Sequence, residues 1–248
     1  MYRFFLSPQC IDGSRVTLGG DLVHQLRHVL RLRAGSCIVV LDDSGWEYEV
    51  ELGETGGGRS SVVSSSRSAG EPVVGITLYQ ALLKGSNFEF VLQKCTELGV
   101  SAFVPISCER CVASAPRRER VARWRSIIRE AAELSGRGRL PELRPQLPFA
   151  EALRSAVGPS LIPWEEESLV GIGEAVRPLV EGGAGAVNIF IGPEGGFPSG
   201  EVDMARERGI VPVSLGRRLL RAETAALAAA TAVLYEYGEM GTRSLSWP

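Results

Sequence analysis

A glycine-rich turn with a carboxylate in its centre is the first candidate ligand site in the sequence. Residues 189–201 read IFIGPEGGFPSGE, an apolar strand followed by the turn and then by an acidic helix start. Glycines at such a junction let a ligand approach the backbone closely. Glu194 lies within the turn, and its charge would repel a phosphate in a poorly solvated crevice. The turn therefore predicts a ligand that is neutral or cationic; a tight turn with no ligand is the alternative.

The turn also lacks the common phosphate-binding patterns. It matches neither G-x-G-x-x-G nor G-x-x-x-x-G-K-[ST], and no lysine follows it. S-adenosylmethionine carries a positive sulfonium and no phosphate, so it suits such a turn. The same observations disfavour a nicotinamide-dependent oxidoreductase.

A second candidate loop, residues 214–225, reads SLGRRLLRAETA. In open α/β sheets, ligands bind beyond the carboxyl ends of the strands. Three predicted loops have this position: after residues 161–164, at 192–196 and at 214–221. Arg221 could stabilise an anion there, whereas Glu223 alone is ordinary for a first helical turn.

Cys108 and Cys111 form one C-x-x-C pair among five cysteines. A structural zinc wants four ligands. There is no second C-x-x-C, and the two histidines, His24 and His28, are far away in sequence. We interpret the cysteines as reduced, incidental thiols and expect no metal.

Basic residues gather in two segments of a chain whose net charge is only −2. In the first, His24, Arg27, His28 and Arg31 have helical spacing on one face. In the second, Arg118, Arg125 and Arg129 flank the apolar stripe of another predicted helix. Either row could bind a nucleic-acid backbone. The alternatives are a solvated helix face and, for the excess of arginine over lysine, a GC-rich coding bias.

The predicted secondary structure that must position these residues changes in type near residue 70. Residues 46–52 alternate apolar and acidic, so residues 37–52 predict a hairpin, followed by a glycine-rich loop (53–58) and a strand at 60–64. A helix at 21–30 would bury Leu22, Leu26, Val29 and Leu30. This first part predicts a small β-barrel or sandwich with one helix, and residues 64–72 its linker.

Beyond residue 72, strands and helices alternate, which predicts a mostly parallel sheet covered on both faces. We expect strands at 73–83, 100–106, 161–164, 187–191 and 211–215, and helices from 87 to Gly99 and at 121–135, 149–157, 200–208 and 222–237. Within 121–135 the predicted buried stripe is Val121, Trp124, Ile127, Ile128, Ala131 and Leu134. The alanine-rich last helix predicts a core helix or, second, a homodimer seam.

Composition is ordinary for a globular protein, with 44% hydrophobic and 23% charged residues. No stretch is long and apolar enough for a membrane span, and the first residues do not resemble a secretory signal. We expect a cytoplasmic protein with no membrane partner.

IGPEGG before a short helix, together with SLGRRLLRAETA, resembles the C-terminal signature of the RsmE family. These proteins are 16S ribosomal RNA uracil-N3 methyltransferases of the SPOUT superfamily. Other segments agree: HQL (24–26), VLRLR (29–33), KCTELGV (94–100), RW (123–124), EAA (130–132) and SGR (135–137). The resemblance spans roughly residues 1–237, and the combination is far more specific than any one piece.

The resemblance implies an α/β protein with a PUA-like RNA-binding β-barrel over residues 1–70 and a SPOUT methyltransferase domain over 71–248. The second domain would have a trefoil-knotted parallel sheet, which general topology rules alone disfavour. It also implies S-adenosyl-L-methionine as methyl donor, 16S rRNA of the small ribosomal subunit as substrate (uridine 1498 in conventional numbering), and a homodimer through the C-terminal domain.

The resemblance places functional roles on particular residues. The cofactor would be bound by Leu161, Ile162, Pro163, Trp164, Ile191, Gly192, Pro193, Glu194, Gly195, Gly196, Ser214, Leu215, Gly216, Leu219 and Leu220. We expect Arg221 to stabilise the anion that uracil forms when N3 loses its proton. Glu223 would position Arg221 or help to remove that proton. The expected RNA-binding residues are His24, Arg27, His28, Arg31, Arg33, Arg118, Arg125 and Arg129.

The sequence departs from the family pattern at two places. Leu134 stands where a glutamine is usual, which puts a polar role there in doubt, and Cys108 and Cys111 flank Glu-Arg where serine is common. Two other functions stay open from the residues: a SPOUT methyltransferase for another RNA, and a catalytically silent rRNA-binding assembly factor.

Overall fold

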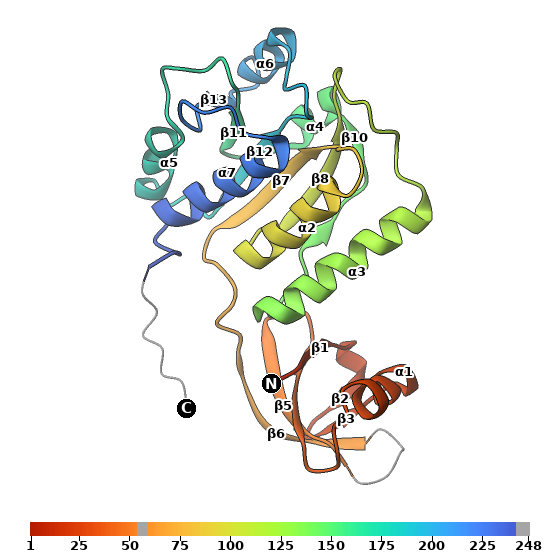
Figure 1. Cartoon of the computed structure of the whole chain (residues 1–248). Coiled ribbons are helices and arrows are strands. Elements are labelled where there is room, and N and C mark those ends of the chain that lie inside the picture. The colour runs from red at the N-terminus through yellow and green to blue at the C-terminus, as the bar shows by residue number, and fades with distance from the viewer. Residues whose placement is uncertain (54–58, 242–248) are drawn as a thin grey trace. The chain divides into compact units, whose positions relative to one another are not determined.

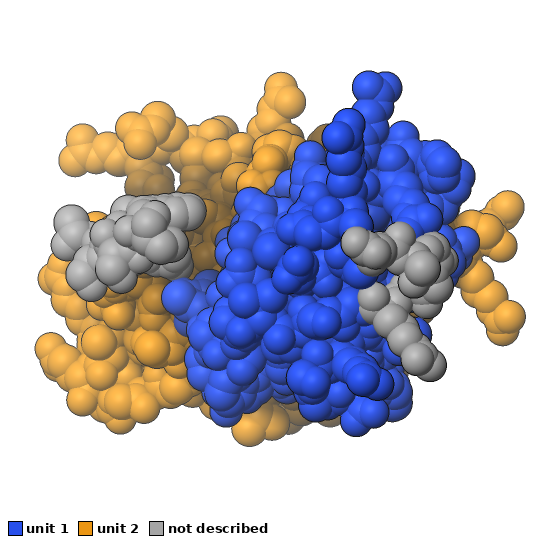
Figure 2. All heavy atoms as spheres, turned by 90° about the horizontal axis from the view of Figure 1, so that it is seen from below, with its two compact units in different colours: residues 1–71, 129–140 blue, residues 72–128, 141–248 orange. Residues whose placement is uncertain are grey.

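The structure, a computed structural model, describes residues 1–53 and 59–241. The chain forms two compact units (Figure 2). Each unit has its own sheet. The first unit consists of residues 1–71 and 129–140, and the second of residues 72–128 and 141–248. Residues 54–58 of the predicted glycine-rich loop lie outside the described residues. No helix in the described ranges is both long and apolar enough to cross a bilayer.

A six-stranded sheet, in the order β1-β4-β5-β6-β3-β2, forms the first unit, and only its β1–β4 pair is parallel. The strands are β1 (Arg3–Phe5), β2 (Ile11–Asp12), β3 (Arg15–Thr17), β4 (Cys37–Leu41), β5 (Trp46–Glu51) and β6 (Arg59–Arg67), with a 3₁₀ turn, η1 (Pro8–Cys10), before β2. The predicted hairpin over 37–52 is confirmed, with Ile38 opposite Val50. The predicted linker is wrong at its start, because Ser64 to Arg67 pair with β5.

The helix that follows β3 in the first unit changes its winding part-way. Helix α1 (Gly20–His24) continues as a π-helical turn, η2 (Gln25–Val29). Leu26 is buried as predicted, but Val29 is 67% exposed, because a wider turn shifts the following side chains away from α-helical spacing. Arg31 lies beyond the helix in the left-handed conformation, with a φ of 56°, so the predicted helical row does not extend to it.

The second unit is built on a parallel sheet, as predicted. Its order is β10-β8-β7-β12-β11-β13, with the short β9 also pairing with β8, and every pair is parallel. The strands are β7 (Gly75–Ala81), β8 (Ala102–Ser107), β9 (Glu142–Leu143), β10 (Leu147–Pro148), β11 (Ser160–Pro163), β12 (Ala186–Ile191) and β13 (Val211–Val213).

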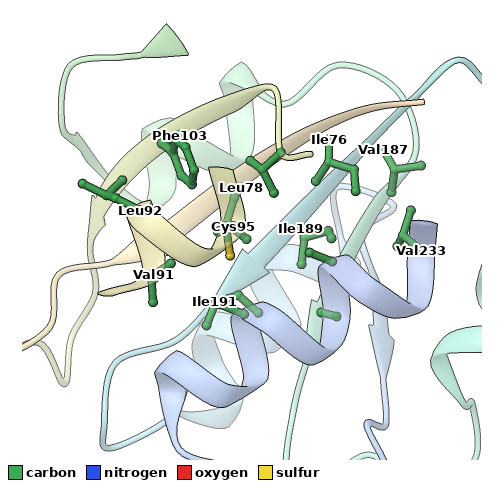
Figure 3. Close-up of a cluster of buried hydrophobic side chains, with 14 of the residues drawn as sticks. Ile76, Leu78, Val91, Leu92, Cys95, Phe103, Val187, Ile189, Ile191 and Val233 are labelled. Carbon is green, nitrogen blue, oxygen red and sulfur yellow. The ribbon is translucent and has the colours of Figure 1, made fainter. Parts of the chain in front are cut away.

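Helices cover both faces of this sheet (Figure 1). They are α2 (Asn87–Leu98), α3 (Arg118–Ser135), α4 (Phe149–Ser155), α5 (Ile172–Glu181), α6 (Ser199–Arg206) and α7 (Ala222–Glu236). On one face, α2 and α7 pack on the strands, where Val91 and Val233 lie in one cluster with Ile189 (Figure 3). On the other face, α4 and α6 pack on Tyr79 and Phe190, whose rings stack 4.3 Å apart.

The last helix is a core helix, the first of its two predicted roles. Ala226, Ala229 and Ala230 of α7 are fully buried, and the helix packs against α2, α5 and β12. Small side chains let these elements approach closely. Helix α5 was not predicted, because Pro178 lies inside it and proline usually ends a helix.

Helix α3 belongs to both units: residues up to Ile128 lie in the second, and those from Arg129 lie in the first. Trp124 and Ile128 are buried as predicted, but Leu134 is 82% exposed. The last turn instead buries Ala132, which packs in the first unit with Phe5 and Leu41. The predicted stripe is therefore wrong at Leu134, because small residues face the core there.

A carboxylate ties the two segments of the first unit together. Oε1 of Glu71 accepts hydrogen bonds from Arg137 Nε (2.9 Å) and from the backbone N–H groups of Gly138 (2.9 Å) and Arg139 (3.1 Å). Its Oε2 accepts a fourth from Arg137 Nη2 at 2.9 Å. The guanidinium of Arg137 is buried, so this ion pair fixes residues 137–139 to residue 71.

Candidate active site

Three loops meet at the carboxyl edge of the parallel sheet. They follow β11, β12 and β13, which are neighbours in the sheet, so their ends lie side by side. The backbone N–H of Trp164 donates to Val213 O at 3.1 Å, and its indole Nε1 donates to Phe197 O at 3.2 Å. Trp164 thus connects all three loops, as expected for the crevice of an open α/β sheet.

A pocket of about 730 Å³ opens between these loops, large enough for a nucleoside-sized ligand. Thirteen predicted cofactor residues line it: Pro163, Trp164, Ile191, Gly192, Pro193, Glu194, Gly195, Gly196, Ser214, Leu215, Gly216, Leu219 and Leu220. The remaining two, Leu161 and Ile162, are buried in the hydrophobic clusters on the two faces of the sheet and do not line the pocket.

The pocket has further lining residues that were not predicted to bind the cofactor. They are Glu165, Glu167, Ser168, Phe197, Arg217, Arg218, Ala222 and Ala225. Arg217, Arg218, Ala222 and Ala225 lie within the second candidate loop, residues 214–225, and the other four lie a few residues beyond residues 161–164 or the glycine turn. The lining combines apolar side chains with both carboxylates and guanidinium groups.

Glu194, the carboxylate of the glycine turn, braces the turn. Its Oε1 accepts a hydrogen bond from the backbone N–H of Lys84, in the β7–α2 loop, at 2.8 Å. The turn itself closes through Gly196 N–H to Pro193 O at 3.0 Å. Gly196 has a φ of +67°, a conformation that other residues rarely adopt. The turn's charged side chain is therefore used to hold the turn in place.

The C-x-x-C segment packs against the same turn. Arg110 Nη1 donates to Gly195 O at 2.8 Å, and the backbone N–H of Glu109 donates to Glu201 Oε1 at 2.9 Å. Glu201 lies in the first turn of α6, directly after the glycine turn. Burial raises the pKa of the Glu201 carboxyl above its ordinary value. Residues 108–111 are thus hydrogen-bonded both to the glycine turn and to the start of α6.

The two cysteines of this segment differ in acidity. A hydrogen bond from Cys108 lowers the pKa of Cys111 to about 7. The same interaction, with burial, raises the pKa of the Cys108 thiol. All five cysteines are free, and within residues 1–53 and 59–241 no group of three or more His, Cys, Asp or Glu side chains is arranged to hold a metal.

The predicted catalytic pair lies at the rim of the pocket. Arg221 is the N-cap residue of α7 and is exposed, and Glu223 lies half-buried in the first turn of that helix. The pocket is lined by Leu220 and Ala222, on either side of Arg221, but not by Arg221 or Glu223 themselves. In the described part of the chain, neither side chain has a hydrogen-bond or ion-pair partner.

The predicted RNA-binding residues are all exposed, in two separate sets. His24, Arg27, His28, Arg31 and Arg33 lie on the first unit, where the His24 and His28 rings are 4.5 Å apart. Arg118, Arg125 and Arg129 lie along α3. Of these three, Arg129 is engaged within the protein, since its Nη1 donates to Phe5 O at 3.0 Å.

Comparison with known proteins agrees with this geometry. Residues 70–234 match the family model of the RNA methyltransferase domain. A ribosomal RNA small subunit methyltransferase E from Synechocystis sp. is 34% identical over 230 residues, which cover 90% of this chain and 74% of that protein. The chain belongs to the RsmE family.

Other RsmE proteins are similar over nearly their whole length. The Bacillus subtilis protein is 30% identical over 249 residues, covering 95% of this chain and 97% of that one. A crystal structure of the RsmE protein from Neisseria gonorrhoeae, bound to S-adenosyl methionine, has a TM-score of 0.85 and 33% identity and covers 95% of this chain and 97% of that chain. The predicted family and its combination of an antiparallel and a parallel sheet are therefore confirmed.

Proposed function

We propose that this RsmE protein transfers a methyl group from S-adenosyl-L-methionine to N3 of one uridine in the 16S rRNA of the small ribosomal subunit. The observation that carries the proposal is the pocket between the loops after β11, β12 and β13, in a chain of this family. The target uridine, position 1498 in conventional numbering, is the family's, and no residue of the pocket identifies it.

The pocket suits a nucleoside without phosphate. Its lining carries the carboxylates of Glu165, Glu167 and Glu194, which repel phosphates, beside apolar side chains such as Ile191 and Leu215 that suit a purine. The thirteen predicted residues that line the pocket would hold the cofactor. When bound, S-adenosylmethionine supplies an electrophilic methyl group on a positively charged sulfur.

The uracil N3 proton must be lost before N3 can act as a nucleophile. The resulting negative charge spreads onto O2 and O4 of the base, and a nearby guanidinium stabilises it. Arg221 meets that need, because its side chain is exposed at the pocket rim and is not used within the described part of the protein. Glu223, two residues further along, positions Arg221 or takes part in removing the proton.

The RNA backbone binds to the exposed basic residues. On the first unit these are His24, Arg27, His28, Arg31 and Arg33, and on α3 they are Arg118, Arg125 and Arg129. Each phosphate contact releases counterions, so binding weakens steeply as salt rises. Because Arg129 also holds Phe5 O, its substitution perturbs the first unit as well.

The assembly and the chain path follow the family. The protein forms a homodimer through its C-terminal domain, and the segments around β11, β12 and β13 form a trefoil knot, for which the strand order β12-β11-β13 is suitable. Its place of action is the cytoplasm, where small ribosomal subunits are made. Light scattering of the purified protein tests the dimer, and a monomeric mass at micromolar concentration contradicts it.

The test of function is mass mapping of 16S rRNA methylated in vitro, both as naked RNA and in assembled subunits. We expect one methylated uridine, and Arg221→Ala should reduce kcat by about 100-fold or more while calorimetry shows unchanged cofactor binding. Methylation of a different RNA class would assign another substrate. A wild-type protein that does not bind S-adenosylmethionine would instead be a silent assembly factor.

A further inference from the structure

Three glutamates line the cofactor pocket, and the protein itself uses two of them. Glu194 accepts the Lys84 N–H at 2.8 Å. Glu167 accepts the N–H groups of Leu169 (2.8 Å) and Val170 (3.3 Å), and its Oε2 lies 3.7 Å from Arg206 Nη2. These interactions lower the pKa of Glu167, chiefly through the hydrogen bond from Leu169, so it is ionised and structurally engaged.

Glu165 is the third, and its carboxylate is uncommitted. In residues 1–53 and 59–241 no hydrogen bond or ion pair engages it, although it lines the pocket. It nevertheless has a defined place, because its Oε1 lies against Gly196 so closely that a Cβ on Gly196 would overlap it. A free carboxylate is therefore located directly over the last glycine of the turn.

We infer that Glu165 binds the ribose of the cofactor by accepting hydrogen bonds from its 2′- and 3′-hydroxyls. This inference rests on the proposed function. An ionised carboxylate has two acceptor oxygens and no donor, which matches two adjacent hydroxyl donors. Glu165 is exposed, so its charge stays hydrated while no ligand is present.

The ribose is a better partner for Glu165 than the positive sulfonium. Attraction between charges at an exposed site is screened by water and salt and contributes little. Paired hydrogen bonds depend instead on geometry, and Gly196 supports that geometry by leaving room for Oε1.

The test is calorimetric titration of Glu165→Ala and Glu165→Gln with S-adenosylmethionine, S-adenosylhomocysteine and 2′-deoxy-S-adenosylhomocysteine. Glu166→Ala is the matched control, because Glu166 is the adjacent exposed glutamate and does not line the pocket. We expect Glu165→Ala to weaken the first two ligands equally, by about tenfold, and the deoxy ligand by less. Glu166→Ala should change none of the three.

Each other outcome has a distinct meaning. A loss for S-adenosylmethionine alone would show that Glu165 recognises the sulfonium charge, and would overturn the inference. Equal binding by Glu165→Ala and wild type would overturn it as well. Failure of the wild-type protein to bind any of the ligands would contradict the proposed function rather than the role of Glu165. Unchanged melting temperatures would show that the variants are folded.

Discussion

The glycine turn and the basic helix of the first unit present their functional groups in opposite ways. The turn, residues 192–196, is held by residues distant in sequence: Lys84 N–H binds Glu194, and Arg110 binds Gly195 O. In the α1–η2 helix, by contrast, His24, Arg27 and His28 are exposed. Apart from the contact between the two histidine rings, their side chains have no partner in the described residues.

This difference fits what we propose that each region recognises. A small cofactor needs a pocket whose shape is fixed before binding, because ordering it afterwards costs free energy. A phosphate backbone needs positive charge more than a fixed geometry. Substitutions in the turn should therefore have large and specific effects, whereas those on the basic helix should be graded and salt-dependent.

Among substitutions in these two regions, the largest effect is expected for Gly196→Ala. Its φ of +67° and the contact with Glu165 both oppose a side chain, so the cofactor Kd should rise by at least about tenfold. Gly183→Ala is the control, since Gly183 has a φ of +69° but open space around it. It should lower the melting temperature and leave the Kd unchanged. Equal Kd values for both variants would mean that the turn is not a fixed cofactor site.

A smaller effect is expected when the α1–η2 helix and Arg31, just beyond its end, lose charge. Arg27→Ala combined with Arg31→Ala should reduce the slope of log K against log salt for RNA binding by about 1.4 to 1.8, through two lost phosphate contacts. Cofactor affinity should not change. Filter binding at several salt concentrations measures the slope. Arg15→Ala, at an exposed arginine of β3, is the control. An unchanged slope in the double variant would remove residues 27–31 from the RNA site.

A further test concerns Glu201, which holds the segment behind the turn. Glu201→Ala leaves the Glu109 N–H without its acceptor and should cost about 1–2 kcal/mol of unfolding free energy. Glu201→Gln keeps an acceptor and removes the buried charge.

The pH dependence of the Gln variant follows from the raised pKa of Glu201. In the wild type the favourable contribution of the protonated carboxyl is complete below the unfolded pKa, near 4.5, and is lost as pH rises through the folded value. Glu201→Gln should therefore unfold at a higher temperature than wild type at pH 8, with the advantage vanishing near pH 4. A constant difference across this range would contradict the assignment.

The smallest effect is a difference in the reactivity of two thiols, and measuring it leaves the sequence unchanged. Because the pKa of Cys111 is about 7, its alkylation by iodoacetamide should accelerate between pH 6 and pH 8 and then level off. Cys108, whose thiol has a raised pKa, should remain unmodified. Peptide mass analysis after timed alkylation distinguishes the two. Preferential labelling of Cys108 would mean that Cys111, rather than Cys108, donates the hydrogen bond between the two residues.

The sequence predicted those features whose signals are local. Period-two alternation identified the β4–β5 hairpin, and alternating strands and helices identified the parallel sheet. The predictions failed where local geometry or contacts with other elements determine the structure. Val29 is exposed because the helix continues as a π-helical turn. In the last turn of α3, Ala132 rather than Leu134 packs in the first unit. Ser64 to Arg67 belong to β6 because they pair with β5.

The candidate site shows the same difference between features that have a local sequence signal and features that do not. Glycines and strand ends predicted most of the lining of the pocket, but Leu161 and Ile162 lie in the core, because hydrophobic clusters cover both faces of the sheet. Glu165 was missed because it follows the apolar strand that served as the signal. The braces of the turn join residues 110 and 85 positions apart, and no local pattern encodes such pairs.

The hydrogen bonds of Glu71 have a consequence for the order of events during synthesis. They bind residues 137–139, and Ala132 and Leu140 pack on Phe5, Val39 and Leu41 of the first unit. A nascent chain that has just completed β6 therefore lacks part of its first unit. More than half of the 248 residues must leave the ribosome before this N-terminal unit can close over its own apolar surface.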